Sequence, residues 1–120
     1  MLRALVRKVE AVAVLQCRGD ITFGEGSYVF YAKVTDVVCD DYQNIVIDLK
    51  DVHSVDYSGV GELVSAVTRI HEAGKVVRFA GMNAKIEGHL THVGVKERFE
   101  RYPDQEAAIR SFALVTGLSV

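Results

Sequence analysis

The apolar positions of the chain fall into two kinds of pattern, short continuous runs and longer segments with helical spacing. Runs of the first kind predict strands at 5–9, 12–17, 44–49 and 75–81, and "RFERY" at 98–102 predicts a short edge strand. The first two are separated by the polar Glu10 and predict a hairpin. The run "NIVIDL" at 44–49 is almost wholly apolar, which is typical of a strand covered on both faces.

Helical spacing predicts four helices, at 27–40, 58–73, 83–93 and 104–116. The pattern is clearest in the second, whose apolar positions are Val60, Leu63, Val64, Val67 and Ile70. Gly74 then fits the glycine that commonly follows the end of a helix.

The first and last of these helices have weaker patterns. The first carries Phe30, Val34, Val37 and Val38 at helical spacing, although its β-branched residues would also suit a strand. The last begins just after Pro103 and places Ile109, Phe112 and Thr116 on one side, flanked by Ala108 and Val115.

The predicted order is β-β-α-β-α-β-α-β-α, with turns or loops at 18–26 and 50–57. Strands that alternate with helices predict an α/β fold with a mostly parallel sheet, in which the first strand is antiparallel to the second. We expect one domain over residues 1–116 and a loose tail at 117–120.

The composition narrows the class of protein. The 120 residues are 49% hydrophobic, enough for one core, and the net charge of −2 gives no case for a nucleic-acid or membrane partner. No signal-peptide pattern is present, and no run approaches the roughly 20 apolar residues that span a bilayer. We therefore expect a cytoplasmic protein in which Cys17 and Cys39 are buried free thiols.

The stretch "SVDYSGVGEL" at 54–63 places Ser58 where a predicted strand, loop and helix meet. Loops at the carboxyl ends of parallel strands often carry function, and helix N-termini favour anions. In a purely structural interpretation, Asp56 or Ser58 caps the helix. Gly59 and Gly61 both disfavour a helix, and we expect them to leave the Ser58 hydroxyl accessible.

Catalytic interpretations of this stretch are weaker. The G-x-S-x-G elbow of serine hydrolases requires glycine where Asp56 stands, and no third group is indicated beside His53. A phosphate-binding G-K-[ST] motif is missing. His89 and His92 lack further ligands at metal-site spacing. We predict a protein without enzymatic activity, metal or cofactor.

The segment "NIVIDLKDVHSVDYSGVGEL" resembles the motif D-[S/T/A]-[S/T]-G-[L/V/I]-[G/A] of STAS domains, above all that of free-standing bacterial anti-sigma factor antagonists. "LQCRGDIT" and "GVKERFERYPDQEAA" extend the resemblance over roughly residues 9–112. The resemblance implies a STAS-like mixed sheet of four to five strands with about four helices.

The resemblance also implies a function. Ser58 corresponds to the family's phosphorylated residue, and the surface that binds the partner corresponds to Asp20, Thr22, Asp56, Tyr57, Ser58, Gly59, Val60 and Gly61. The implied partner is an anti-sigma factor with the ATP-binding fold of a histidine-kinase-like serine kinase. A PP2C-type phosphatase would reverse the phosphorylation.

Two positions differ from the family pattern. Thr22 stands where many antagonists carry an aspartate that is associated with phosphorylation, and Tyr57 replaces a small residue. They keep a second interpretation open, in which the chain is a non-catalytic scaffold of a larger signalling assembly and Ser58 is mainly a helix cap. The oligomeric state is also left open, with a homodimer as one candidate.

Overall fold

Five strands form one sheet in the order β1-β2-β3-β4-β5 in the computed structural model, which describes residues 1–118 and their side chains as far as residue 112. The strands are β1 (Leu2–Val9), β2 (Val12–Ile21), β3 (Asn44–Val55), β4 (Val76–Ala80) and β5 (Arg101–Tyr102). The helices are α1 (Glu25–Cys39), α2 (Tyr57–Glu72), α3 (Ala84–Val93), the 3-10 helix η1 (Lys96–Arg98) and α4 (Gln105–Leu118).

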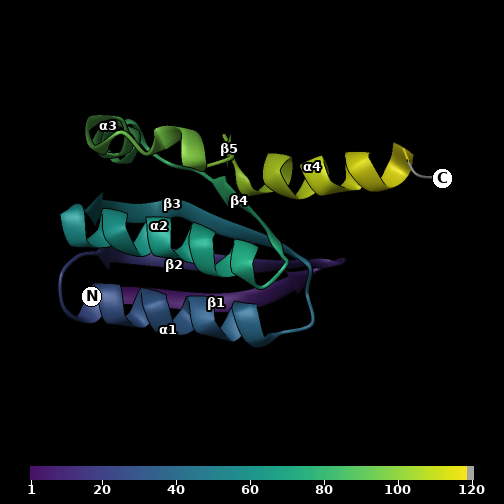
Figure 1. Cartoon of the computed structure of the whole chain (residues 1–120), viewed down its shortest axis with the longest axis horizontal. Coiled ribbons are helices and arrows are strands. Elements are labelled where there is room, and N and C mark those ends of the chain that lie inside the picture. The colour runs from purple at the N-terminus through teal and green to yellow at the C-terminus, as the bar shows by residue number, and fades with distance from the viewer. Residues whose placement is uncertain (119–120) are drawn as a thin grey trace.

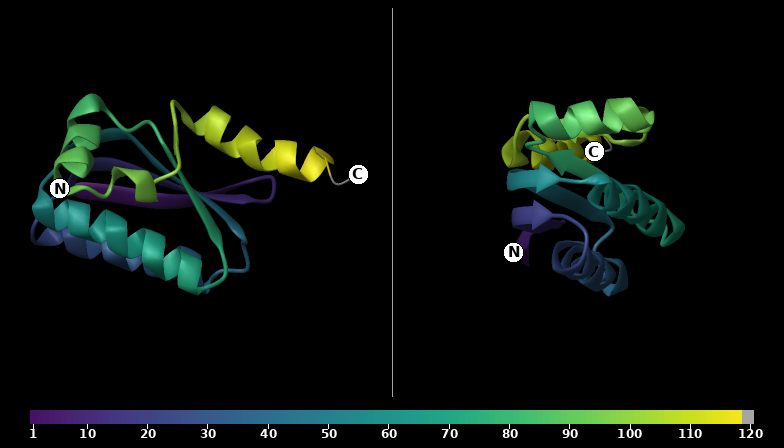
Figure 2. Two further views of the ribbon diagram at one scale, coloured as in Figure 1. Left: turned by 45° about the horizontal axis from the view of Figure 1, so that its top comes forward. Right: turned by 90° about the vertical axis from the view of Figure 1, so that its left-hand side faces the viewer.

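The sheet has the predicted topology. β1 is antiparallel to β2, and every other neighbouring pair is parallel. Helices α1 and α2 cover one face of the sheet, and α4 packs on the other face over β3, β4 and β5 (Figures 1 and 2). The predicted α/β fold and element order are therefore confirmed.

The main core lies between the sheet and helices α1 and α2, where Phe30, Leu63 and Phe79 are fully buried. Of the five apolar positions predicted for α2, Val64 is half-buried and the others are buried. A smaller core beneath α4 contains Val46, Ala108 and Phe112. The predicted flanking positions Val115 and Thr116 lie outside the described side chains.

Several predicted boundaries are wrong. β3 continues to Val55, so most of the predicted loop 50–57 is strand, and β2 runs to Ile21 through part of the predicted turn 18–26. The two extensions pair with each other across two register shifts. At the other edge, β5 contains only Arg101 and Tyr102, because Arg98 belongs to η1 and residues 99–100 lie in neither a helix nor a strand.

The two cysteines differ in exposure. Cys17 is buried, and burial together with the nearby Asp48 carboxylate raises its pKa to about 12. Cys39 is exposed at the end of α1, so the prediction that both thiols are buried is wrong for this residue. Both thiols are free, as predicted.

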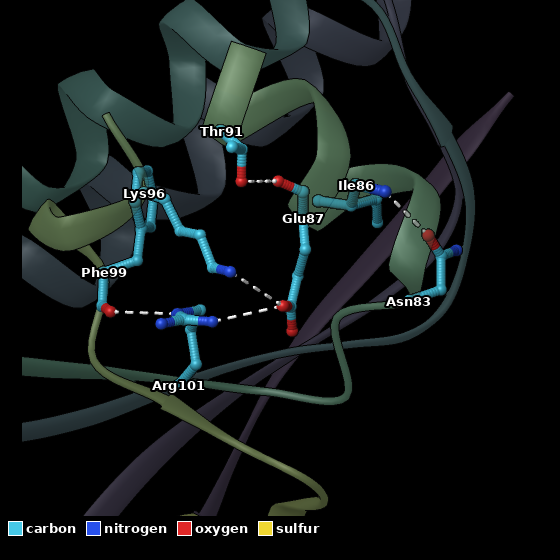
Figure 3. Close-up of polar contacts among 7 residues, drawn as sticks. All are labelled: Asn83, Ile86, Glu87, Thr91, Lys96, Phe99 and Arg101. Atoms are coloured by element: carbon cyan, nitrogen blue, oxygen red, sulfur yellow. Dashed lines mark hydrogen bonds and ion pairs between the residues drawn. The ribbon is translucent and has the colours of Figure 1, made fainter. Parts of the chain in front are cut away.

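A small polar cluster holds α3 against η1 and β5 (Figure 3). The Glu87 carboxylate accepts from Arg101 Nη1 at 3.1 Å and pairs with Lys96 Nζ at 3.8 Å. Asn83 caps α3 by accepting from the Ile86 N–H at 2.8 Å. Ion pairs this exposed contribute at most about 1 kcal/mol each, so the cluster orients α3 more than it stabilises the fold.

No helix within residues 1–118 has the length and apolar character that a membrane span requires.

Candidate functional site

Ser58 lies in the first turn of α2, immediately beyond the carboxyl end of β3. This turn follows Asp56, which is the N-cap residue of the helix. The side chain of Ser58 is half-buried, between the exposed Tyr57 and the buried Gly59. The structure thus presents Ser58 at a helix N-terminus, as the strand-loop-helix pattern predicted, but Asp56 is the cap. The prediction that Ser58 itself is mainly a cap is wrong.

The Asp56 carboxylate connects two segments that are far apart in the sequence. Its Oδ1 accepts from the Gly59 N–H at 2.8 Å, within α2. Its Oδ2 accepts from the Phe23 N–H at 2.9 Å, in the turn between β2 and α1. These bonds, led by the one from Phe23, lower the pKa of Asp56, and the backbone N–H groups of Asp56 and Ser58 add to the effect. A negative charge is therefore held at the N-terminus of α2.

Gly59 is required by packing. A Cβ atom at this position would lie 1.9 Å from the Ile21 carbonyl oxygen and 2.7 Å from Val55 Cγ1, so the helix meets the end of β2 backbone to backbone. Gly61 is different, because a Cβ there would have no neighbour within 4 Å. Of the two glycines, only Gly61 fits the predicted role of leaving open space near Ser58. Val60 is buried in the core, so it packs beneath the surface that contains Ser58.

Two aromatic side chains lie at the surface of this region. Tyr57 is 64% exposed, and its ring centroid lies 6.1 Å from that of His89 in an edge-on arrangement. Phe23 is 83% exposed although it is apolar, and its backbone is bonded to Asp56. Phe23 was not predicted as a site residue, and His89 was considered only as a metal ligand. A large apolar residue next to Gly24 in a turn was a usable signal for Phe23, whereas no sequence signal linked His89 to Tyr57.

The remaining predicted site residues lie on either side of this turn. The Thr22 carbonyl oxygen accepts from both the N–H and the Oγ of Ser27, each at 2.9 Å, and so holds the start of α1. Asp20 Oδ1 accepts from Ser54 Oγ at 2.8 Å across β2 and β3. Thr22 is therefore adjacent to the Asp56-bound turn, and Asp20 is engaged within the sheet.

The chemistry available around Ser58 is that of anion binding. Unpaired N–H groups and the dipole of α2 favour negative charge at this end of the helix. No side chain in the described part of the chain forms a hydrogen bond with the Ser58 hydroxyl, so no general base is paired with it. Within the described residues, no three His, Cys, Asp or Glu side chains are grouped as a metal site would require.

Comparisons with known proteins identify a family from the sequence and a shared fold from solved structures. The sequence profile of the STAS domain matches residues 3–108. No curated protein matches the chain by sequence. Solved structures share the fold: an anti-sigma factor antagonist from Mycobacterium paratuberculosis has 18% identity and a TM-score of 0.79, with 92% of this chain and 93% of that chain covered.

Two further structures show the range of proteins that carry this fold. The anti-sigma factor antagonist SpoIIAA in its unphosphorylated form has 13% identity and a TM-score of 0.67, with 96% of this chain and 99% of that chain covered. The murine anion transporter Slc26a9 has 20% identity and a TM-score of 0.76. There the match covers 91% of this chain and 18% of the transporter.

The two glycines of the motif form a matched pair for a stability test. Gly59→Ala should destabilise the protein by about 2 kcal/mol or more, because its Cβ would overlap backbone that cannot move aside. Gly61→Ala should be neutral or stabilising by up to about 1 kcal/mol, because alanine favours a helix and has space here. Urea denaturation measures both. Equal effects would contradict the backbone contact.

Asp56 should give a defined pH dependence. Its pKa in the folded protein is below the unfolded value, so the stabilisation is complete above about pH 4 and is lost as the pH falls through the folded-state pKa. Asp56→Asn keeps one capping oxygen and loses the charge. The stability of wild type relative to Asp56→Asn, measured in urea, should therefore be greatest at pH 6–7 and should decrease below about pH 4. A pH-independent difference would contradict a charged Asp56.

Proposed function

The chain belongs to the STAS domain family, and on this premise we propose that it is an anti-sigma factor antagonist-like binding module controlled by reversible phosphorylation at Ser58. Its partner would be an anti-sigma factor with the fold of a histidine-kinase-like serine kinase, which phosphorylates Ser58 in the cytoplasm. A PP2C-type phosphatase would remove the phosphate. The module itself catalyses nothing in this scheme.

The observation that carries the proposal is the position of Ser58 in the first turn of α2, beside a carboxylate that already occupies the helix N-terminus. A phosphate group adds about −1.5 to −2 charges and three acceptor oxygens. The backbone N–H groups of this turn can accommodate it, because helix N-termini bind anions. The start of the helix can therefore carry a phosphate on Ser58, although Asp56 already accepts one of these N–H groups.

The bonds of Asp56 suggest how phosphorylation reaches the neighbouring turn. A phosphate on Ser58 would compete with the Asp56 carboxylate for the same N–H groups and would repel its charge. Weakening Asp56 would release its bond to the Phe23 N–H. Phosphorylation would then change the binding surface twice, by adding charge and by freeing the turn that carries an exposed phenylalanine.

The surface around Ser58 suits a protein partner in its unmodified state. Phe23 and Tyr57 expose most of their aromatic surface on the two segments that Asp56 joins. Exposed aromatic side chains are enriched in protein interfaces, and charges are depleted from interface cores. A dianion at Ser58 would therefore oppose binding where a neutral hydroxyl is accepted.

A second candidate is a scaffold role, in which the domain is an unmodified subunit of a larger assembly. The likeness to Slc26a9 favours a scaffold role, because in that transporter the same fold is one part of a longer chain and covers 18% of it. Thr22 also favours it, because many antagonists carry aspartate at this position. Treatment with a cognate kinase and Mg-ATP, followed by intact mass, separates the two: the switch gains one phosphate on Ser58, and the scaffold gains none.

Three forms of the protein should bind the partner with decreasing affinity. Ser58→Ala should fold with nearly wild-type stability and bind the partner, because Asp56 supplies the cap. Ser58→Asp should fold and bind more weakly, because it places a charge in the interface. The phosphorylated protein should bind most weakly, because phosphoserine carries more charge than aspartate. Thermal melts and calorimetric titration of the partner measure both properties.

The control for this series is Ser65, a half-buried serine two turns further along α2. Ser65→Asp should leave the affinity unchanged, because it lies away from the helix N-terminus. Equal affinity of wild type, Ser58→Asp and phosphorylated protein would contradict the switch and leave the scaffold as the better account.

A further inference from the structure

A second surface with unassigned chemistry lies on β1 and β2, on the sheet face opposite α1 and α2. Side chains alternate along these strands, so Arg3, Leu5, Gln16 and Arg18 share this face. The register places Arg3 directly opposite Arg18 and Leu5 opposite Gln16. Helix α4 packs over β3, β4 and β5, and so leaves this part of the face uncovered (Figure 2).

The two arginines are a like-charged pair on neighbouring strands. Like charges directly opposite each other on neighbouring strands destabilise a sheet. Neither guanidinium forms an ion pair or a side-chain hydrogen bond with any residue that the structure describes between 1 and 118. Asp51 is opposite Arg18 in the register of β2 and β3, yet the two side chains form no ion pair. Both arginines are exposed, so an external anion can reach them.

The backbone fixes this pair in place. At Gly19, which has φ +115°, a Cβ atom would lie 2.0 Å from the Met1 carbonyl oxygen, so the start of β1 lies directly against β2. A register shift between Gln16 and Arg18 makes Asp48 and Asp51 their respective neighbours on β3. The arrangement of charges is therefore a consequence of strand pairing and not of flexible side chains alone.

A hollow of about 410 Å³ lies at this position, lined by Arg3, Leu5, Gln16, Arg18 and Asp51 among others. Its volume is within the range of sites for small molecules, about 300–1,000 Å³. Gln16 Oε1 accepts from Arg7 Nε at 3.1 Å, so the amide NH₂ group of Gln16 remains available as a donor. Two arginines, a glutamine, an exposed leucine and one aspartate thus line the same hollow.

We propose that this hollow, the Arg3–Arg18 site, binds a small soluble molecule that carries a phosphate or carboxylate group. The two guanidinium groups match the geometry of an oxyanion, because each presents a planar fork of N–H donors. Leu5, which is 57% exposed, offers apolar contact to the body of the molecule. Asp51 offers an acceptor for a hydroxyl group on it. This proposal does not depend on Ser58 or on the partner proposed above.

The test uses glycerol 3-phosphate as probe, which has one phosphate and two hydroxyl groups, with inorganic phosphate and glycerol as its two fragments. Titrations of the whole protein are followed by amide NMR. Resonances of Leu5 and Gln16 should shift with glycerol 3-phosphate, less with inorganic phosphate and not with glycerol. Arg3→Gln together with Arg18→Gln should weaken binding roughly tenfold or more, because charge-assisted bonds are lost.

The matched control is Lys33→Gln together with Lys85→Gln, which removes the same net charge from α1 and α3, both away from this face. It should bind as wild type does. Arg18→Lys should bind with intermediate affinity, because lysine keeps the charge and loses the fork. Circular dichroism establishes that each variant is folded before it is titrated.

Three results would overturn the proposal: no shift at Leu5 and Gln16 with millimolar glycerol 3-phosphate, equal weakening in the arginine and lysine double variants, or binding to vesicles of phosphatidylglycerol without binding to the soluble probe. The last would assign the same chemistry to a lipid headgroup. Each result is independent of whether the protein binds an anti-sigma factor.

Discussion

The arrangement around Ser58 depends on the two hydrogen bonds that the Asp56 carboxylate accepts. One of its oxygens closes the first turn of α2 at Gly59, and the other accepts from the Phe23 N–H in the turn before α1. The two helices on this face of the sheet therefore begin at a common point. The direct contact of Gly59 with the Ile21 carbonyl brings them close enough for one carboxylate to bond both segments. Ser58 owes its position to these two contacts.

The sequence predicted this region in outline because its signals are local. The apolar run at 44–49 and the helical spacing from Val60 to Ile70 both depend on neighbouring residues alone, and both are confirmed. An Asp at the start of a helix is likewise a local cap signal. Gly59 was predicted to leave the Ser58 hydroxyl accessible, which is wrong. Its packing partner Ile21 is distant in the sequence, so no local pattern indicated the contact. The link from Asp56 to Phe23 was missed for the same reason.

The errors in the strands have a similar cause. The residues 50–55 are partly polar and resemble a loop, but they pair with the end of β2 across two register shifts. Such pairing is a tertiary effect that outweighs local preference. Cys39 was predicted to be buried from its apolar neighbours, whereas the helix turns it outward beside the buried Val37. Periodicity fixes the buried side of a helix well in its middle and poorly at its last residue.

Two separate regions of the chain are candidate binding surfaces. Ser58 and its aromatic neighbours lie at the N-termini of α1 and α2, where a protein partner can reach the surface. The Arg3–Arg18 site lies on the sheet face that these helices do not cover. Strands β2 and β3 connect them, since Asp20 and Ser54 are bonded just beyond Arg18 and Asp51.

Amide NMR spectra of the Ser58-phosphorylated and the unmodified protein test directly whether Asp56 couples the two segments. The Gly59 and Phe23 amide resonances should both shift strongly, and the Phe23 amide should lose its protection from hydrogen exchange, because phosphate displaces the shared carboxylate. Distant amides of β4 should stay unchanged. A shift at Gly59 alone, with Phe23 still protected, would contradict a role for Asp56 in coupling the two segments.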